Sequence, residues 1–239
     1  RGPPLVSSPH VGISMKITTV VFDKDGTLSD NATFKPLLQH ILDKLPQHKE
    51  VLSEILGWDL VTEDFVCDAY FLTATVDLIN AALDKAGVLV EYTPVFEKAM
   101  EEIYEVKTLG DVPKLFTDLR SRGYKIAMLT SDDRRPTELF NTQFKLVDLL
   151  ESVVCGDDGH GQKPSAEPLL YIAKQLGVEP SSMVMVGDSK GDVNSGQAAG
   201  CRTISVLTGA GDPATIQHAD AVLPSVHDML EVLDKWEAE

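Results

Sequence analysis

The sequence predicts an α/β protein with a doubly wound parallel sheet and an all-helical domain inserted after its first strand. Short β-rich runs alternate with helical patterns, and this alternation is typical of a parallel sheet with helices on both faces. Most of the runs are continuously apolar, as expected of strands that are covered on both sides. The runs, in chain order, are residues 17–23, 124–131, 152–157, 182–188, 202–208 and 221–225, the last a predicted edge strand.

The helices of the predicted core follow the strands in order. Residues 111–122 place Val112, Leu115, Phe116 and Leu119 at helical spacing, and Gly123 follows as a stop signal. Glycine also ends two of the later patterns. The remaining predicted core helices are residues 165–176, 191–199 and 226–236.

The interval from residue 30 to residue 107 has helical periodicity and no convincing strand. It starts directly after the first strand, so we expect a helical cap domain over 30–107, inserted into a core of 15–29 and 108–239. A long helical excursion packed as part of the core is the alternative. Residues 1–14 are expected to be a flexible tail or a remnant of processing, with Met15 a candidate internal start. The candidate cap helices are 36–45, 51–56, 63–71, 76–86 and 93–106.

Composition narrows the class of function. The 239 residues carry a formal net charge of −16, so we expect no nucleic-acid partner and no anionic membrane partner. No apolar run approaches the roughly 20 residues of a membrane-spanning helix. Cys67, Cys155 and Cys201 lie far apart, which favours a reducing compartment over disulfides or a zinc site. These features predict a cytoplasmic protein, either a monomer or a homodimer.

The first strand ends in two acids, Asp23 and Asp25, followed by Gly26. Ligands of open α/β sheets bind at the carboxyl ends of the strands, where these carboxylates can face one pocket. Gly26 allows a tight turn and leaves backbone N–H groups open to an anion. The alternatives are a solvated turn or a calcium loop, but a calcium loop needs a Glu where this chain has Phe34.

Later strand ends carry further polar groups. Thr130 and Ser131 can hold phosphate oxygens, although such a pair is also a common helix cap. Lys163 is either a surface lysine or a cation that neutralises a phosphoryl group. Asp188 and Asp192 are either a helix cap with a surface acid or two groups of one metal site.

Taken together and in this order, these residues resemble the motifs of the haloacid-dehalogenase-like hydrolase superfamily, which has a Rossmann-like core. Asp23 to Thr27 resemble its DxDGT signature, and Asp188 with Asp192 resemble its GDxxxD motif. Thr130 or Ser131 and Lys163 match its second and third motifs. The helical insert sits where the C1-type cap of this family lies, and the chain end resembles the phosphoglycolate-phosphatase-like branch.

The resemblance implies a Mg²⁺-dependent phosphatase acting on a small phosphorylated metabolite, such as phosphoglycolate or a sugar phosphate. Asp23 is then the nucleophile that forms an aspartyl-phosphate, and Asp25 is the acid and base. Mg²⁺ is expected on Asp23, the backbone carbonyl of Asp25, Asp188 and water, with Asp192 either binding metal or orienting Lys163. Gly26 N–H, Thr130, Ser131 and Lys163 are expected to hold the phosphoryl oxygens.

Other chemistries of the superfamily fit these residues less well. Dehalogenases lack the second acid of the first motif, which is Asp25 here, and phosphonatases replace it. A transporting ATPase would have a Thr at this position and membrane spans. Hexose-phosphate mutases of the β-phosphoglucomutase type usually continue the motif with Gly-Val, where this chain has Gly26-Thr27. A mutase or phosphotransferase, and a non-catalytic regulatory protein, remain the alternative interpretations.

The cap sequence says less about the substrate. Residues 30–107 contain no arginine, which weakens the case for a substrate with a second anionic group. Lys35 and Lys44 are possible substitutes, while Arg134 and Arg135 are expected at a helix start on the surface. An aromatic group is expected in the cap core, with stacking on a sugar or nucleotide as the alternative; it comprises Trp58, Phe65, Tyr70 and Phe71.

Overall fold

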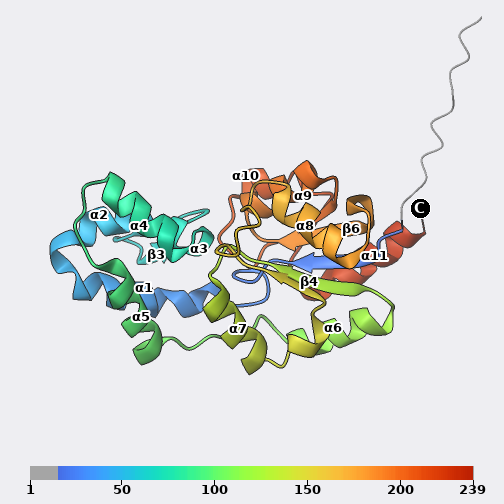
Figure 1. Ribbon diagram of the computed structural model, residues 1–239, viewed down its shortest axis with the longest axis horizontal. Coiled ribbons are helices and arrows are strands. Elements are labelled where there is room, and N and C mark those ends of the chain that lie inside the picture. Colours follow the sequence, from blue (N-terminus) through green and yellow to red (C-terminus); the bar gives the residue numbers. More distant parts are fainter. Residues whose placement is uncertain (1–15, 239) are drawn as a thin grey trace, which may run out of the picture.

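Residues 16–238 are described by the computed structural model, so the tail predicted at 1–14 lies outside the described residues. Six parallel strands form one sheet in the order β5-β4-β1-β6-β7-β8 (Figure 1). The chain winds outward from β1 in both directions, which confirms the predicted doubly wound α/β fold. The strands are β1 (Thr19–Phe22), β4 (Lys125–Leu129), β5 (Ser152–Val154), β6 (Met183–Gly187), β7 (Arg202–Val206) and β8 (Ala221–Leu223).

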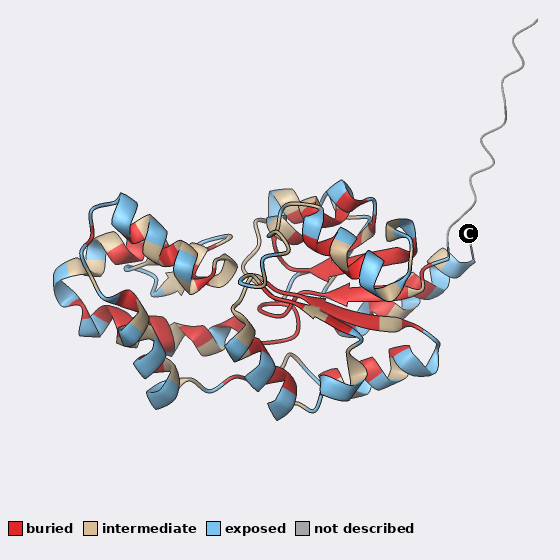
Figure 2. Ribbon diagram, viewed as in Figure 1, coloured by how far each residue is buried: buried red, intermediate tan, exposed pale blue. Residues whose placement is uncertain are grey.

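Helices cover both faces of this sheet, and Figure 2 shows the strands buried between helices whose outer faces are exposed. One face packs a cluster that includes Phe22, Phe116 and Leu233, and the other packs Val21, Leu169 and similar residues. The central strands are thus apolar on both sides, as their sequences require. The core helices are α6 (Val112–Ser121), α7 (Arg134–Gln143), α8 (Glu167–Leu176), α9 (Lys190–Ala199), α10 (Pro213–Ile216) and α11 (Met229–Glu237).

Helix α7 was not among the predicted core helices, although a helix start was expected at Arg134 and Arg135. Its sequence, RRPTELFNTQ, is largely polar, and its buried positions are Thr137, Phe140 and Asn141. Phe140 is the one large apolar side chain among these buried positions, so the helix shows no hydrophobic periodicity in its sequence. Short 3₁₀ helices add turns at Asn31–Thr33, Pro46–His48, Val147–Leu149, Pro180–Ser182 and Val226–Asp228.

The segment 30–107, called the cap below, lies beyond one end of the sheet (Figure 1). Most of its buried apolar residues form a cluster of their own, including Leu38, Leu52 and Tyr92, whereas Val106 near its end packs into a cluster of the sheet. That the cap is a separable domain stays a prediction. Its helices are α1 (Phe34–Lys44), α2 (Lys49–Leu56), α3 (Tyr70–Thr73), α4 (Val76–Lys85) and α5 (Tyr92–Ile103).

The cap also contains a short β-ribbon, so the expectation of no strand and of a helix over 63–71 was wrong. Strands β2 (Trp58–Asp59) and β3 (Asp64–Phe65) pair antiparallel. The Asp59 carboxylate accepts hydrogen bonds from two backbone N–H groups of the connecting turn, at 2.7 and 3.0 Å. The rings of Trp58 and Phe65 pack edge to face across the ribbon. Side-chain capping of the turn and this cross-strand pair favour the ribbon over a helix.

Among residues 16–238, no helix is both long enough and apolar enough to cross a membrane.

Candidate active site

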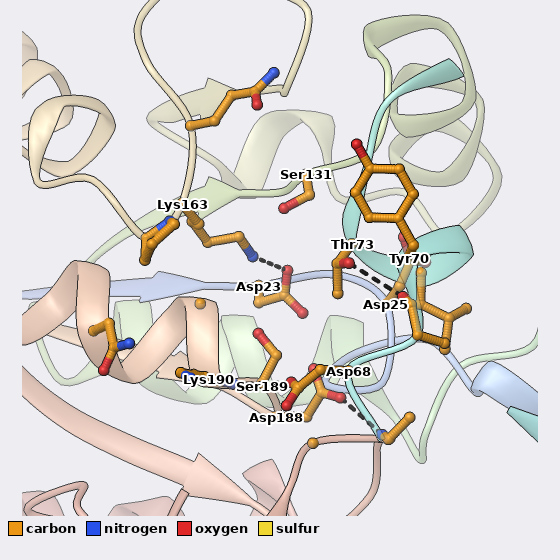
Figure 3. A pocket seen from close by; sticks show the side chains of 18 of the residues that line it. Asp23, Asp25, Asp68, Tyr70, Thr73, Ser131, Lys163, Asp188, Ser189 and Lys190 are labelled. Atoms are coloured by element: carbon orange, nitrogen blue, oxygen red, sulfur yellow. Dashed lines mark hydrogen bonds and ion pairs between the residues drawn. The ribbon is translucent and has the colours of Figure 1, made fainter. Parts of the chain in front are cut away.

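Asp23, Asp25, Ser131 and Asp188 line a cavity of about 330 Å³ between the sheet and the cap (Figure 3). Asp23 and Asp25 reach it from the end of β1, Asp188 from the end of β6 and Lys163 from the loop after β5. The carboxyl ends of parallel strands share one edge of the sheet, so groups 140 and more residues apart meet there.

Lys163 is buried and bonded to two carboxylates, so it is not a surface lysine. Its Nζ lies 2.7 Å from Oδ1 of Asp23 and 2.7 Å from Oδ1 of Asp192. The other oxygen of Asp192 accepts from the Ser189 N–H at 2.9 Å and from the Ser189 hydroxyl at 2.6 Å. Asp192 therefore orients Lys163 while capping helix α9, which is one of the two roles that the sequence left open.

Buried negative charge accumulates at this point. Asp23, Asp188 and Asp192 each offer a carboxylate oxygen, and the three oxygens lie within 4.8 Å of one another. Burial raises the pKa of Asp23 to about 7, although Lys163 lowers it, with Asp192 adding to the rise. Burial and the neighbouring Asp23 also raise the pKa of Asp188 well above its usual range.

This donor set fits a divalent cation. Hard carboxylate oxygens are the ligands of Mg²⁺, and a buried acidic cluster with one lysine is short of positive charge. Asp23 and Asp188 are the residues that would hold the ion, and Asp192, whose oxygens accept from Lys163 and Ser189, is the third carboxylate of the group. The raised pKa values of Asp23 and Asp188 agree with this lack of positive charge, because buried carboxylates close to one another hold protons more tightly.

Gly26 forms the tight turn that was predicted, but its backbone N–H is not open to an anion. It has φ of 82°, and an added Cβ would come within 2.5 Å of the Asp188 carboxylate, so only glycine fits. Its N–H donates to the Ser29 carbonyl at 2.9 Å. The expectation that this N–H is open to a phosphoryl oxygen is therefore wrong, because the turn uses it for its own closure.

The loop after β7 was missed by the sequence analysis. The Ala210 N–H donates to Oδ2 of Asp188 at 3.0 Å, and the Thr208 hydroxyl donates to the Gly26 carbonyl at 2.7 Å. A Cβ on Gly209 would lie 1.8 Å from the Asp188 carboxylate. The Gly-Ala-Gly run directly after an apolar strand was the available signal, since close backbone approach needs small residues.

The two hydroxyls after β4 have different places. Ser131 lines the cavity (Figure 3), whereas the buried Thr130 hydroxyl accepts a hydrogen bond from the Asp132 N–H at 3.1 Å. Thr130 is thus used to hold its own loop. Only Ser131 of the pair faces the space where a phosphoryl group would lie.

Asp25 lines the cavity, and its carboxylate accepts hydrogen bonds from Lys24 and Ser29. Lys24 Nζ lies 2.6 and 2.8 Å from the two oxygens of Asp25, and the Ser29 hydroxyl donates to one of them at 2.8 Å. Lys24 also pairs with Asp132 at 2.9 Å. The sequence analysis assigned no role to Lys24, because a lysine between two acids is usually a solvent-exposed side chain.

The cap closes the cavity with a short stretch around α3. Asp68, Tyr70 and Thr73 line it (Figure 3), and Asp68 contacts the core through its N–H, 2.8 Å from the Ala210 carbonyl. The Asp133 carboxylate of the core also accepts a hydrogen bond from the Val76 N–H of the cap, at 3.1 Å. These contacts place cap and core residues around one space.

Of the four aromatic residues singled out in the cap, three pack in the cap core and one lines the cavity. Trp58, Phe65 and Phe71 pack on one another in the cap core, with ring centroids 5.1 and 5.8 Å apart in successive pairs, while Tyr70 faces the cavity. Arg134 begins α7 as expected but pairs with Asp158.

Comparison with known proteins agrees with this geometry. A family model described as "Haloacid dehalogenase-like hydrolase" matches residues 20–206. A phosphoglycolate phosphatase of Escherichia coli (strain K12) is 29% identical over 244 residues, covering 91% of this chain and 92% of the relative. The pyrophosphatase PpaX of Bacillus pumilus is 30% identical over 220 residues, covering 91% and 96%.

Solved structures show the same fold. A predicted phosphoglycolate phosphatase from Haemophilus somnus superposes with a TM-score of 0.70 at 20% identity, covering 90% of this chain and 97% of the other. A putative β-phosphoglucomutase from Thermotoga maritima superposes with a TM-score of 0.64 at 21% identity, covering 92% and 99%.

Proposed function

Because the chain belongs to the haloacid dehalogenase-like hydrolases, in the phosphoglycolate-phosphatase-like branch, we propose that it hydrolyses a small phosphate monoester through an aspartyl-phosphate on Asp23. The class of enzyme, a phosphoric monoester hydrolase, follows from the family and its phosphatase relatives. One observation carries the proposal. Asp23 lines the cavity together with Asp25, while Lys163 and Asp188 flank its carboxylate.

The proposed reaction uses the residues in two steps. A carboxylate oxygen of Asp23 attacks phosphorus, the bond to the leaving oxygen breaks, and Asp25, which must enter this step as the protonated acid, gives that oxygen its proton. Asp25 then takes a proton from the water that attacks the aspartyl-phosphate, which regenerates Asp23 and releases phosphate. Lys163 and Ser131 line the same cavity and hold the phosphoryl oxygens, whose charge they stabilise.

Mg²⁺ is the proposed cofactor, held by Asp23 and Asp188. When bound, it supplies positive charge that offsets the repulsion between the nucleophile and an anionic substrate. The three clustered carboxylates support this proposal, since their charge exceeds that of the one buried lysine beside them.

The walls of the cavity favour a hydroxyl-bearing ester over phosphoglycolate. Among the described lining residues, the cap supplies the Asp68 carboxylate and the hydroxyls of Tyr70 and Thr73, but no lysine or arginine. On the cap side a second carboxylate on the substrate would face Asp68, and the further lysine of the described lining, Lys190, comes from the core, where its N–H donates to Asp68 at 3.2 Å. Hydroxyl groups, in contrast, suit acceptor and donor groups of this kind.

A panel of phosphate esters with Mg²⁺ tests the proposed function. We expect phosphate release from polyol or sugar phosphates with a higher kcat/KM than from phosphoglycolate. Conversion of a sugar bisphosphate without net phosphate release would instead show a mutase. No release from any ester would contradict the proposed function.

Replacing Ser131 with Ala is expected to raise KM for a phosphate ester about tenfold, because a hydrogen bond to a charged group contributes about 1.5 kcal/mol or more. Thr130→Ala is the matched control, since the Thr130 hydroxyl is buried and bonds within its own loop. Steady-state kinetics on both variants measure the difference. An equal KM for both would show that Ser131 does not hold the substrate.

A further inference from the structure

A buried lysine stands between the two catalytic acids, and no step above uses it. The Lys24 side chain is 1% exposed, and its Nζ contacts both oxygens of Asp25, at 2.6 and 2.8 Å. The same Nζ lies 2.9 Å from Oδ2 of Asp132, in the loop after β4, and 5.6 Å from the centroid of the Phe140 ring. The ammonium is thus fixed from several sides.

The Lys24 side chain is a charged ammonium. Burial alone would lower the pKa of Lys24, but the neighbouring Asp132 and Asp25 carboxylates outweigh it and raise the pKa above its usual value. A buried ammonium costs several kcal/mol unless good partners replace its water, and here two carboxylates do so. A chain that needed only packing at this position could use an apolar residue at lower cost.

We propose that Lys24 is a positioning residue that holds the Asp25 carboxylate in its place at the cavity. Lys24 and the Ser29 hydroxyl together fix the orientation of a group that must meet first the leaving oxygen and then the attacking water. Acid–base catalysis requires this geometry within hydrogen-bond reach. The inference rests on the proposed role of Asp25.

The second partner of Lys24 extends this support toward the cap. Oδ1 of Asp132 accepts from the Asp133 N–H at 2.8 Å, and the Asp133 carboxylate accepts from the Val76 N–H of the cap. Lys24 therefore ties Asp25 to the loop on which the cap rests. The position of the acid depends on residues more than 100 positions away in the sequence.

The test compares two esters on Lys24→Met, a variant that keeps most of the length of the side chain and loses the charge. Glycerol phosphate needs a proton on its leaving oxygen, whereas p-nitrophenyl phosphate does not. A misplaced Asp25 should therefore lower kcat/KM for glycerol phosphate at least about tenfold more than for p-nitrophenyl phosphate. It should also slow breakdown of the intermediate, so that p-nitrophenol appears as a burst followed by a slower steady state.

Three variants make the result decisive. Lys24→Met leaves two buried carboxylates without their cation, so Lys24→Met/Asp132→Asn is made as well, to recover stability. We expect the difference between the two esters to persist in this double variant when thermal unfolding shows it folded. Lys125→Met is the control, because that lysine bonds the Leu176 carbonyl outside the cavity and should leave the ratio unchanged.

Asp25→Asn separates this inference from the proposed function. If Asp25→Asn shows the ester difference and the folded Lys24 variants lose rate equally on both esters, Lys24 is structural and the inference is overturned. If Asp25→Asn itself lacks the difference, the proposed role of Asp25 fails instead.

Discussion

Replacing Asp23 with Asn is expected to lower kcat for p-nitrophenyl phosphate with Mg²⁺ at least about 10⁴-fold, because an amide oxygen is a far weaker nucleophile than a carboxylate. The substitution nearly preserves shape. Lys163 keeps Asp192 as a partner at 2.7 Å, so the fold should be retained and should be checked by thermal unfolding. The loss of rate would then be chemical.

A matched substitution controls for the loss of one negative charge. Asp148 is exposed in a 3₁₀ turn outside the cavity, and Asp148→Asn should keep the rate of the unchanged protein. If Asp23→Asn retained turnover within about tenfold of the unchanged protein, nucleophilic catalysis by Asp23 would be excluded.

Removal of divalent metal is the second large effect. With a chelator, hydrolysis is expected to fall at least about 10³-fold, since the acidic cluster and the substrate phosphate then repel one another without compensation. Added Mg²⁺ should restore it. Asp188→Asn should raise the Mg²⁺ concentration needed for half-maximal activity, and a titration of rate against Mg²⁺ measures this.

The pKa of Asp23 gives the metal effect a pH dependence. Burial raises this pKa to about 7 in the metal-free protein, so below that pH the ion must displace a proton to bind. Mg²⁺ affinity, measured by calorimetry, should therefore rise as pH increases toward 7, and the raised pKa of Asp188 acts in the same direction. Activity that survives exhaustive chelation would contradict a metal requirement.

The sheet and its site could be predicted because both depend on local signals. Most strands are continuous apolar runs, and parallel strands bring their carboxyl ends to one edge whatever lies between them. Asp188 was found in this way directly after a strand, and Lys163 in the loop that follows one. Their distances to Asp23 follow from the topology of the sheet.

The features that the sequence did not predict have a common physical cause. Each depends on a contact with a residue distant in the sequence or on a backbone hydrogen bond. The ribbon of β2 and β3 has strands of two residues, too short for any periodicity. The Gly26 N–H is taken by the turn that the motif itself forms. Lys24 is buried by Asp132, which is more than 100 residues away. Asp68 reaches the site by a contact between cap and core.

The most direct test of the account is to stop the reaction in acid during turnover and to map the phosphoryl group by mass spectrometry. Acid quenching preserves an acyl phosphate that neutral hydrolysis would remove. We predict one phosphoryl group on the peptide that contains Asp23, formed with Mg²⁺ and substrate and absent from Asp23→Asn. Full turnover with no phosphoryl group on that peptide, or with the group on another residue, would contradict covalent catalysis by Asp23.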